Sequence, residues 1–440
     1  MKDRLVCPSE ETLSALGADI YQLLEDLFPF CRSLSGDGVR KTFDLIQEVV
    51  PVTRTEVPSG TQVFDWTVPK EWNVRDAYVV APDGEKIIDF STSNLHLLGY
   101  SRPFRGTLSL ADLRQHLYTL EDQPDIVPYL TTYYDDNWGF CLSHRQYEAL
   151  EEGDYQVVVD TSLEDGSLSY AEAYVAGDQE TEVLITCYTC HPSMANDSLS
   201  GVVVIAHLAN YLRQFKLKHS YRFLFIPETI GSIAWLAKNE DRLDRIVCGL
   251  VCTCCGDRGA LTYKRSRRGD TIVDRAAEHV LDRRDGDTTI EDFFPYGSDE
   301  RQFCSPGFDM AVGSLMRTRY GKFDEYHTSA DDLDFVGPEY LADTLAAYVE
   351  VINILEHDTT LVSTNPKCEP QLGKRGLYRA IGGQKLDVRE DPEIAILWLM
   401  NMSDGKHSLL DIAERSGMRF ETIKSVSDVL VSHGLLQTPA

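Results

Sequence analysis

Short apolar runs alternate with amphipathic segments over the second half of the chain. From residue 172 onward, strand-like runs and segments with apolar residues at helical spacing follow one another. The expected strands are 183–186, 221–226, 246–253 and 310–312, and the expected helices are 201–215, 232–238, 270–281 and 340–355. This alternation predicts an α/β fold with a mostly parallel sheet and helices on both faces. Residues 13–50 also have helical periodicity, so we assign 1–60 and 166–362 to one α/β domain.

The pattern changes between these two segments. Residues 61–165 contain short β runs, many aromatic side chains and turn sequences such as 82–84, with a helical stretch only near 108–117. We interpret this region as a β-rich subdomain inserted into the α/β domain. Insertions at the ligand-bearing edge of a sheet commonly form substrate walls. The candidates for such a wall, or for a small aromatic core of the insert, are Trp66, Trp72, Tyr133, Tyr134 and Trp138.

The C-terminal residues 371–440 follow a linker at 365–370. Three short helical segments are expected, at 393–402, 408–416 and 419–433, and their order resembles a winged helix-turn-helix. The third segment places Arg419 and Lys424 beside Glu421 and Asp428, so its charge is balanced. A DNA-reading helix is basic, and this helix therefore favours protein contact or homo-oligomerisation over DNA binding.

The candidate chemistry begins in a polar crossover after the first of the regular strands. Residues 186–201 lie between the apolar runs 183–185 and 202–208, which are typical of a buried strand and a helix. Such crossovers at the carboxyl ends of strands carry the ligand sites of open α/β sheets. His191 supplies an imidazole and Asp197 a carboxylate, a pairing that suits zinc. By themselves, the two residues also fit a helix cap and a hydrogen-bonded surface pair.

Two later stretches complete a recognisable series. Glu228 lies at the carboxyl end of the strand 221–226, and His327 precedes an acidic turn in the stretch 326–334. The order of His191, Asp197, Glu228 and His327 resembles that of the co-catalytic zinc aminopeptidases and carboxypeptidases, the clan that also holds the glutaminyl cyclases. That resemblance implies two imidazoles on opposite metals, a bridging Asp, and a Glu-Glu pair acting as general base and ligand.

A closer resemblance extends along almost the whole chain. Longer motifs stand at 64–72, 94–96, 133–141, 297–302 and 371–378. They are similar to those of a bacterial group of "aminopeptidase-like domain" proteins, often labelled as polysaccharide-biosynthesis proteins, which also carries a C-terminal winged helix. The activity of that group is itself inferred from fold, so the motifs do not name a reaction.

Two departures from the dinuclear pattern concern the metal count. The Glu-Glu pair is here Glu228-Thr229, and the strand ending at Thr253 lacks the Asp ligand, with Asp257 as the nearest carboxylate. Both departures favour one zinc ion (Zn²⁺) per chain, held by His191, Asp197 and His327. Glu228 is then either the general base or a ligand. We favour the base, because three protein ligands are the usual number in a catalytic zinc site.

These residues indicate a zinc metallo-aminopeptidase-like amidohydrolase. Its substrate is expected to be a small molecule or short peptide, with an amide or peptide bond in an aminoacyl or sugar-linked metabolite. Arg301 and Arg317 are candidates for binding a substrate carboxylate or phosphate, and Tyr326 is a further substrate-binding candidate beside His327. The alternatives are a mononuclear zinc acyl transferase resembling glutaminyl cyclase, and a non-catalytic binding or regulatory protein.

Composition restricts the partners and the compartment. The formal net charge of the 440 residues is −28, which disfavours general binding to nucleic acid or to anionic membranes. The chain has no run of eighteen apolar residues and its start lacks an apolar signal core, so we expect a cytoplasmic protein. Most of the eleven cysteines lie in or beside apolar runs. Buried thiols in a reducing compartment fit them better than a four-thiolate zinc site.

Overall fold

The computed structural model describes residues 3–284, 286–377 and 391–439. The chain divides into two compact units, Met1–Asp274 with Gly286–Val349 and Arg275–Asp285 with Glu350–Ala440. The first unit contains an eight-stranded sheet in the order β1-β10-β12-β11-β13-β16-β14-β15. Its strands are β1 (Thr53–Pro58), β10 (Ser167–Val175), β11 (Glu182–Tyr188), β12 (Ser220–Ile226), β13 (Ile246–Cys252), β14 (Leu261–Lys264), β15 (Thr288–Glu291) and β16 (Val312–Met316).

Parallel strands form the centre of this sheet. β11 pairs in parallel with both β12 and β13, and β13 pairs in parallel with β16, whereas β1, β10 and β14 join antiparallel. All seven residues of β11 and of β12 are buried, as expected for strands covered on both faces. The predicted α/β class is therefore confirmed, with antiparallel strands added outside the parallel centre.

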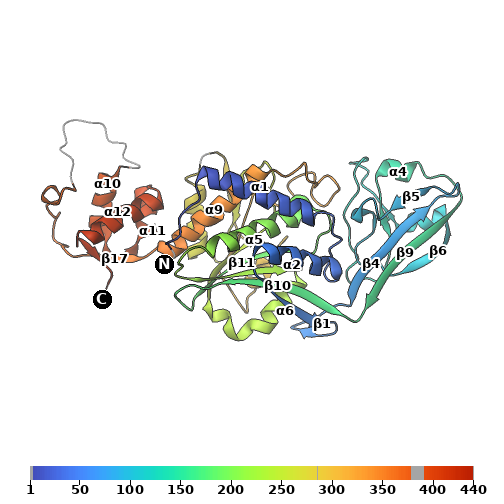
Figure 1. The fold of residues 1–440 in the computed structure, drawn as a ribbon, viewed down its shortest axis with the longest axis horizontal. Helices are drawn as coiled ribbons and strands as arrows, with labels where there is room; N and C mark the ends of the chain where they lie inside the picture. Colours follow the sequence, from blue (N-terminus) through green and yellow to red (C-terminus); the bar gives the residue numbers. More distant parts are fainter. Residues whose placement is uncertain (1–2, 285, 378–390, 440) are drawn as a thin grey trace. The chain divides into compact units, whose positions relative to one another are not determined.

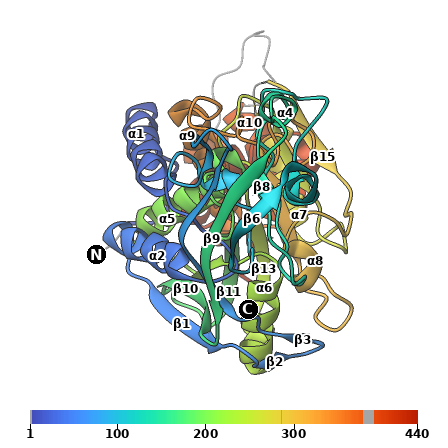
Figure 2. The ribbon, with the colours of Figure 1, turned by 90° about the vertical axis from the view of Figure 1, so that its right-hand side faces the viewer.

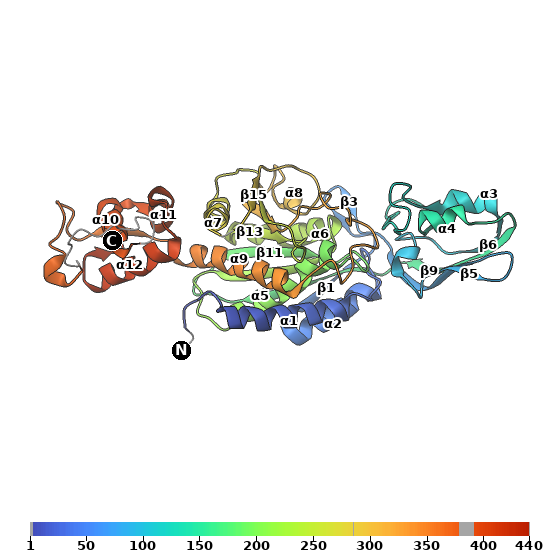
Figure 3. The same cartoon turned by 90° about the horizontal axis from the view of Figure 1, so that it is seen from above.

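Helices cover both faces of the sheet. α1, α2 and α5 lie on one side of β11, and α6 and α8 lie on the other (Figure 2); Figure 3 shows α1, α2 and α5 opposite α8 from above. The chain therefore passes from β11 through α5 to β12 on one face, and from β12 through α6 to β13 on the opposite face. Their bounds are α1 (Glu10–Leu27), α2 (Asp37–Val49), α5 (Gly201–Leu212), α6 (Ile230–Asn239), α7 (Ile272–Leu281), α8 (Glu300–Phe303) and α9 (Pro338–His357), with 3-10 helix η4 at Glu240–Arg245.

The strand expected at 310–312 lies instead at Val312–Met316, and β14 and β15 were not predicted. The apolar run of β16 is interrupted by Gly313 and Ser314, although all five of its residues are buried. A side chain at Gly313 would collide with the ring of Tyr263 on β14, so packing explains the small residue. A pattern based on apolar side chains misses a strand whose neighbours require small ones.

The β-rich insert leaves the sheet after β1 and returns at β10, and these two strands pair with each other. Its main sheet has the order β5-β4-β9-β6, with the long β9 running beside β6 (Figures 1 and 2). The bounds are β2 (Gln62–Val63), β3 (Trp66–Thr67), β4 (Glu71–Val80), β5 (Lys86–Asp89), β6 (Phe104–Ser109), β7 (Leu117–Tyr118), β8 (Phe140–Cys141), β9 (Asp154–Glu164), α3 (Leu110–Leu113) and α4 (His144–Glu148), with 3-10 helices η1 (Asn94–His96) and η2 (Arg114–His116).

Two of the five aromatic candidates form the core of the insert. Trp72 is buried and donates its indole N–H to the Ser101 carbonyl at 2.9 Å. Trp138 is 2 % exposed and stacks on Phe104, with ring centroids 4.1 Å apart. For Trp72 and Trp138, the interpretation as wall residues is therefore wrong, because the core of the insert encloses them.

In its described residues, the second unit contains a three-stranded sheet in the order β18-β17-β19 with helices α10, α11 and α12, and its bounds also take in the C-terminal parts of α7 and α9. Its elements are β17 (Thr360–Ser363), η5 (Gly373–Arg375), α10 (Pro392–Met402), β18 (Asp404–Ser408), α11 (Leu409–Ser416), α12 (Phe420–Ser432) and β19 (Leu436–Gln437). Ser408 caps α11 with a reciprocal capping box, and Gly417 ends it in the left-handed conformation. In the described ranges, no helix has the length and hydropathy needed to cross a membrane.

Candidate metal centre

The ends of three central strands converge at one point of the sheet. β11 lies between β12 and β13, and the chain crosses on opposite faces after β11 and after β12. Such a reversal opens a crevice at the carboxyl ends of the strands. His191 follows β11, Glu228 follows β12 and Thr253 follows β13. The topology thus explains why residues far apart in the sequence share one site.

Three of the predicted metal-binding residues meet in this crevice. The ligand atoms of His191, Asp197 and His327 all lie within 4.8 Å of one another. Asp197 Oδ2 and His327 Nε2 are 2.8 Å apart. Neither atom has a hydrogen bond of acceptable geometry among the described residues. The pair would form an ion pair if His327 were protonated, and with a neutral imidazole the two atoms are suitable ligands for a shared cation. Imidazole with carboxylate is a donor set that zinc accepts.

The electrostatics also suit a cation. Burial lowers the pKa of His191 to about 4, so its imidazole is neutral at pH 7 with a lone pair free for a metal. Burial alone would raise the pKa of Asp197, but His191, His327 and Tyr188 outweigh it and hold this pKa below its usual value. The carboxylate is therefore ionised although it is fully buried.

Asp197 lies on an irregular turn fixed by another carboxylate. Residues Ala195–Ser200 form a π-helical segment (η3) in which Ser198 has a φ of 106°, unfavourable for a side chain. Asp331 accepts the backbone N–H groups of Asn196 at 2.6 Å and Asp197 at 2.8 Å. These two bonds hold the strained turn in place. Asp331 follows His327 by four residues, so one short segment supplies both a candidate ligand and the support of another.

Tyr188, the last residue of β11, orients the Asp197 carboxylate. Its hydroxyl donates to Asp197 Oδ1 and accepts a hydrogen bond from Thr253 Oγ1 at 2.6 Å. All three side chains are buried. These two hydrogen bonds occupy Asp197 Oδ1 and leave Asp197 Oδ2 directed toward His327. The strand end that lacks an Asp ligand thus supplies a hydrogen bond in its place.

Replacing Tyr188 by Phe is expected to weaken zinc binding by about 10- to 100-fold, the usual cost of losing a partner that orients a ligand. The Asp197 carboxylate would lose the donor to its Oδ1 atom. Zinc affinity measured by competition with a chromophoric chelator checks this. Tyr155→Phe is the matched control, because among the described residues the Tyr155 hydroxyl bonds the Glu151 carbonyl in the insert and none of the candidate ligands. Equal affinities of the two variants would contradict the role of Tyr188.

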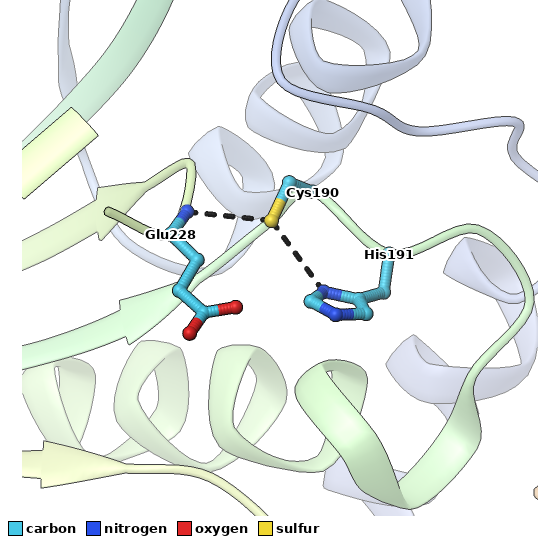
Figure 4. Close-up of side chains that lie close together, drawn as sticks. All are labelled: Cys190, His191 and Glu228. Carbon is cyan, nitrogen blue, oxygen red and sulfur yellow. Dashed lines mark hydrogen bonds between the residues drawn. The ribbon is translucent and has the colours of Figure 1, made fainter. Parts of the chain in front are cut away.

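A second group of possible ligands shares His191. The ligand atoms of Cys190, His191 and Glu228 also lie within 4.8 Å of one another. Cys190 Sγ accepts the Glu228 N–H at 3.3 Å and lies 3.4 Å from His191 Nδ1. Figure 4 shows the Cys190 sulfur between the backbone nitrogen of Glu228 and the imidazole of His191. The Glu228 carboxylate and the His191 imidazole extend to the same side of the sulfur. Cys190 was predicted only as a buried thiol, because CxxC spacing in a β run gave no signal for a place beside the metal ligands.

Glu228 is placed where a general base or a ligand would act. Burial, reinforced by the negative charges of Asp299 and Asp197, raises its pKa well above the usual range. A raised pKa brings a carboxyl group toward the range in which proton transfer at neutral pH is effective. The structure thus supports a proton-transferring role for Glu228, while its distance from His191 leaves the ligand role open.

Thr229 replaces the second Glu of the dinuclear pattern and has a strained backbone, with a φ of 63°. Its N–H donates to Asp299 Oδ1 at 2.7 Å, and its hydroxyl accepts from Arg301 Nη2 at 3.0 Å. Asp299 is buried, and this burial raises its pKa to about 7. Thr229 therefore ties the strand end of β12 to the segment 299–301 and carries no metal-binding atom of its own.

Two predicted substrate-binding residues lie outside the crevice. Arg317 is 7 % exposed, and its guanidinium donates to the Gly259 carbonyl at 2.9 Å and to Asp343 at 2.8 Å. These bonds occupy the cation, and Arg317 is not among the residues that line the cleft beside His191 and Glu228. Tyr326 stacks on the imidazole of His327 with centroids 4.0 Å apart, and it supports that ligand without lining the cleft.

The carboxylate Asp257 is also directed away from the candidate ligands. It accepts hydrogen bonds from Asn196 Nδ2 at 3.0 Å and from Thr318 Oγ1 at 2.6 Å. Asp257 does not belong to either group of possible ligands found among the described residues.

The insert forms one wall of a cleft of about 450 Å³ that opens onto His191, Glu228 and His327. His191, Glu228, Arg301 and His327 line it together with four aromatic residues of the insert, Trp66, Tyr129, Tyr133 and Tyr134. The prediction that the insert closes over the crevice is confirmed for Trp66, Tyr133 and Tyr134. Sequence reasoning missed Tyr129, whose backbone N–H donates to the His327 carbonyl at 2.8 Å and whose ring lies about 5 Å from both imidazoles.

Comparisons with known proteins agree with this geometry. The family model "Domain of unknown function (DUF4910)" matches residues 21–358, and a winged helix-turn-helix model matches residues 359–438. A Clostridium acetobutylicum protein named "Putative polysaccharide biosynthesis protein with aminopeptidase-like domain" is 54% identical over 424 residues, which cover 96% of this chain and 97% of the relative. The resemblance to that bacterial group is thereby confirmed.

Solved structures show the same fold. The crystal structure of a "putative peptidase" from Clostridium acetobutylicum has a TM-score of 0.92 and 52% identity, covering 97% of both chains. A zinc aminopeptidase from Bacillus subtilis has a TM-score of 0.58 at 13% identity, covering 78% of this chain and 95% of the other. The chain therefore belongs to the DUF4910 family, with a fold like that of the zinc aminopeptidases and a C-terminal winged helix-turn-helix domain.

Proposed function

We propose that the protein is a zinc-dependent hydrolase of aminopeptidase type, acting on an amide bond of a small aminoacyl or sugar-linked metabolite. The observation that carries this proposal is the convergence of His191, Asp197 and His327 within 4.8 Å in the crevice that Glu228 also lines. Two imidazoles, one ionised carboxylate and a separate carboxyl group are the parts that metal-assisted hydrolysis requires. A cleft of about 450 Å³ suits a small substrate.

Each residue of the candidate site would have a distinct role in such a reaction. His191, Asp197 and His327 would hold a zinc ion, and Tyr188 and Asp331 keep Asp197 oriented. Zinc supplies Lewis acidity toward the scissile carbonyl and a nucleophile at neutral pH. Glu228 accepts the proton of the attacking water and passes it to the leaving amine, for which its raised pKa is suited. Trp66 and Tyr133 of the insert line the crevice and would limit the access of bulk water to it.

The protein is expected to carry about one zinc ion per chain. The two groups of possible ligands share His191, and Thr229 and Thr253 stand where the dinuclear pattern has carboxylates. One ion therefore satisfies the available donors. Elemental analysis of protein purified without chelator measures the ratio of zinc to chain. Two tightly held metals, or none, would contradict the assignment.

Turnover tests the reaction itself. Zinc-loaded protein incubated with a panel of aminoacyl and N-acyl sugar amides should release a free amine, detected by mass spectrometry. Transfer of the acyl group to another acceptor, or cyclisation of the substrate without uptake of water, would instead identify an acyl transferase. Stoichiometric zinc without any turnover on the panel would favour a binding protein.

A further inference from the structure

Arg301 is a cation that lines the cleft and forms no ion pair with any of the residues that the structure describes. Its guanidinium donates one hydrogen bond, from Nη2 to Thr229 Oγ1 at 3.0 Å, and its Nε is buried without an acceptor. Over the residues that the structure describes, no carboxylate forms an ion pair with it. The carboxyl groups of Glu228 and Asp299 are close enough for Arg301 to lower their pKa values without bonding to it. An unpaired guanidinium facing a cleft is a binding site for an anion.

The neighbours of Arg301 explain why it is left free. Glu300 is fully buried and directed away from the cleft, where it pairs with the equally buried Lys264 and accepts from Ser314 Oγ at 3.1 Å. Asp299 instead accepts the Thr229 N–H at 2.7 Å. Asp299 and Glu300 are the two carboxylates that precede Arg301, and neither forms an ion pair with it among the described residues, although Asp299 Oδ2 is buried without a hydrogen-bond partner. The buried ion pair of Glu300 with Lys264 anchors the segment 299–301, and the hydrogen bond to Thr229 Oγ1 orients the guanidinium.

Thr229 supplies a second hydrogen-bond donor for an anion. Its hydroxyl oxygen accepts the hydrogen bond from Arg301, so its own hydrogen remains available to donate. Thr229 and Arg301 both line the cleft with His191 and Glu228. A carboxylate or phosphate bound there would receive hydrogen bonds from a cation and a hydroxyl, within the same small cleft as the proposed reaction centre.

The insert provides an apolar surface for the rest of such a ligand. Trp66 and Tyr134 line the cleft, are 36 % and 57 % exposed, and lie edge to face with centroids 5.5 Å apart. Exposed aromatic pairs of this kind offer a flat, weakly polar surface to a ring or an apolar group. The cleft therefore combines an anion-binding end with an aromatic wall.

We propose that the cleft selects amides that carry a carboxylate or phosphate, bound by Arg301 and Thr229, with the body of the substrate against Trp66 and Tyr134. This inference rests on the proposed hydrolase function, which it extends to a substrate class. Charge-assisted hydrogen bonds to a buried anion change affinity by about 10- to 100-fold. That factor is the expected preference for an anionic ligand over its neutral counterpart.

Two matched pairs of probes separate carboxylate from phosphate. The first pair is alanylalanine and its C-terminal carboxamide, and the second is N-acetylglucosamine 6-phosphate and N-acetylglucosamine. Dissociation constants for the zinc-loaded protein are measured by calorimetry, with Arg301→Met, Arg301→Lys and Arg75→Met as variants. Arg75 is a suitable control because it is exposed and pairs with Asp160 on the insert sheet. Thermal melting of each variant reports whether it folds.

At least one pair is expected to show a preference of about 10- to 100-fold for its anionic member in the wild type and in Arg75→Met. The preference should vanish in Arg301→Met and be smaller but present in Arg301→Lys, which keeps the charge and loses the planar fork. Ratios near one for both pairs would overturn the proposal. So would a preference that survives Arg301→Met, which would indicate an anion bound directly to the metal.

Hydrolysis of the same probes distinguishes this inference from the function on which it rests. Cleavage of neutral and anionic members at equal kcat/KM would contradict the anion site and leave the hydrolase intact. Anion-selective binding that depends on Arg301, without release of amine from these probes or from the wider panel, would support the site and contradict the hydrolase.

Discussion

Replacing Glu228 by Gln is expected to leave the zinc content unchanged and to lower turnover by about 10²–10⁴-fold, the usual loss when a general base is removed. Glutamine keeps the size of the side chain and its place beside Cys190 and His191, but it cannot accept a proton. His191, Asp197 and His327 remain as three ligands, the number found in catalytic zinc sites. Zinc analysis and kcat on a substrate from the amide panel measure the two effects separately.

The control for this change is Glu180→Gln, which neutralises an exposed carboxylate before β11. It should retain both zinc and turnover. A fall in zinc content of Glu228→Gln would identify Glu228 as a ligand, in agreement with the alternative group of Cys190, His191 and Glu228. Full turnover with full zinc content would exclude both roles.

Replacing His327 by Ala is expected to reduce bound zinc from about one ion per chain to nearly none, and to abolish turnover with it. The change removes one of two imidazoles and leaves a site with two protein ligands, fewer than catalytic zinc sites use. The His327 side chain is 35% exposed, and its removal loses the stacking contact with Tyr326 at the edge of the crevice, so the fold should persist. Zinc content after gel filtration, together with the melting temperature of the metal-free protein, distinguishes lost binding from lost folding.

His433→Ala is the matched control, because His433 is an exposed imidazole at the end of α12. It should retain zinc. If His327→Ala bound zinc as tightly as the wild type, the Cys190, His191 and Glu228 group would become the metal site.

The sequence predicted the architecture because each part of it is encoded locally. Fully buried strands such as β11 and β12 require continuous apolar runs, and the covering helix α5 requires apolar residues at most of its positions. Once the alternation indicates parallel strands, residues at the carboxyl ends of neighbouring strands must share one edge. His191 and Glu228 were therefore predicted to be close without knowledge of any contact.

What the sequence could not decide concerns partners that are distant in the chain. The sequence pattern does not distinguish Arg301 from Arg317. In the structure Asp343 binds Arg317. Glu300 instead pairs with Lys264 and Asp299 accepts the Thr229 N–H, so neither forms an ion pair with Arg301. Trp66 and Trp72 are six residues apart, and only the packing of the insert exposes the first in the cleft and buries the second.

The same division applies to the metal centre. Local pattern identified His191 and Asp197 as donors, whereas the 2.8 Å approach of His327 to Asp197 depends on a segment more than a hundred residues away. The supports of that approach, Asp331 and Tyr188, carry no signal of their own, because a buried carboxylate or hydroxyl acquires its role only from the group it meets. The sequence by itself thus determined the central strands β11, β12 and β13, the helices α5 and α6 between them, and their order. Tertiary structure decided which polar side chains meet, since hydrogen bonds and ion pairs depend on distance and direction in space.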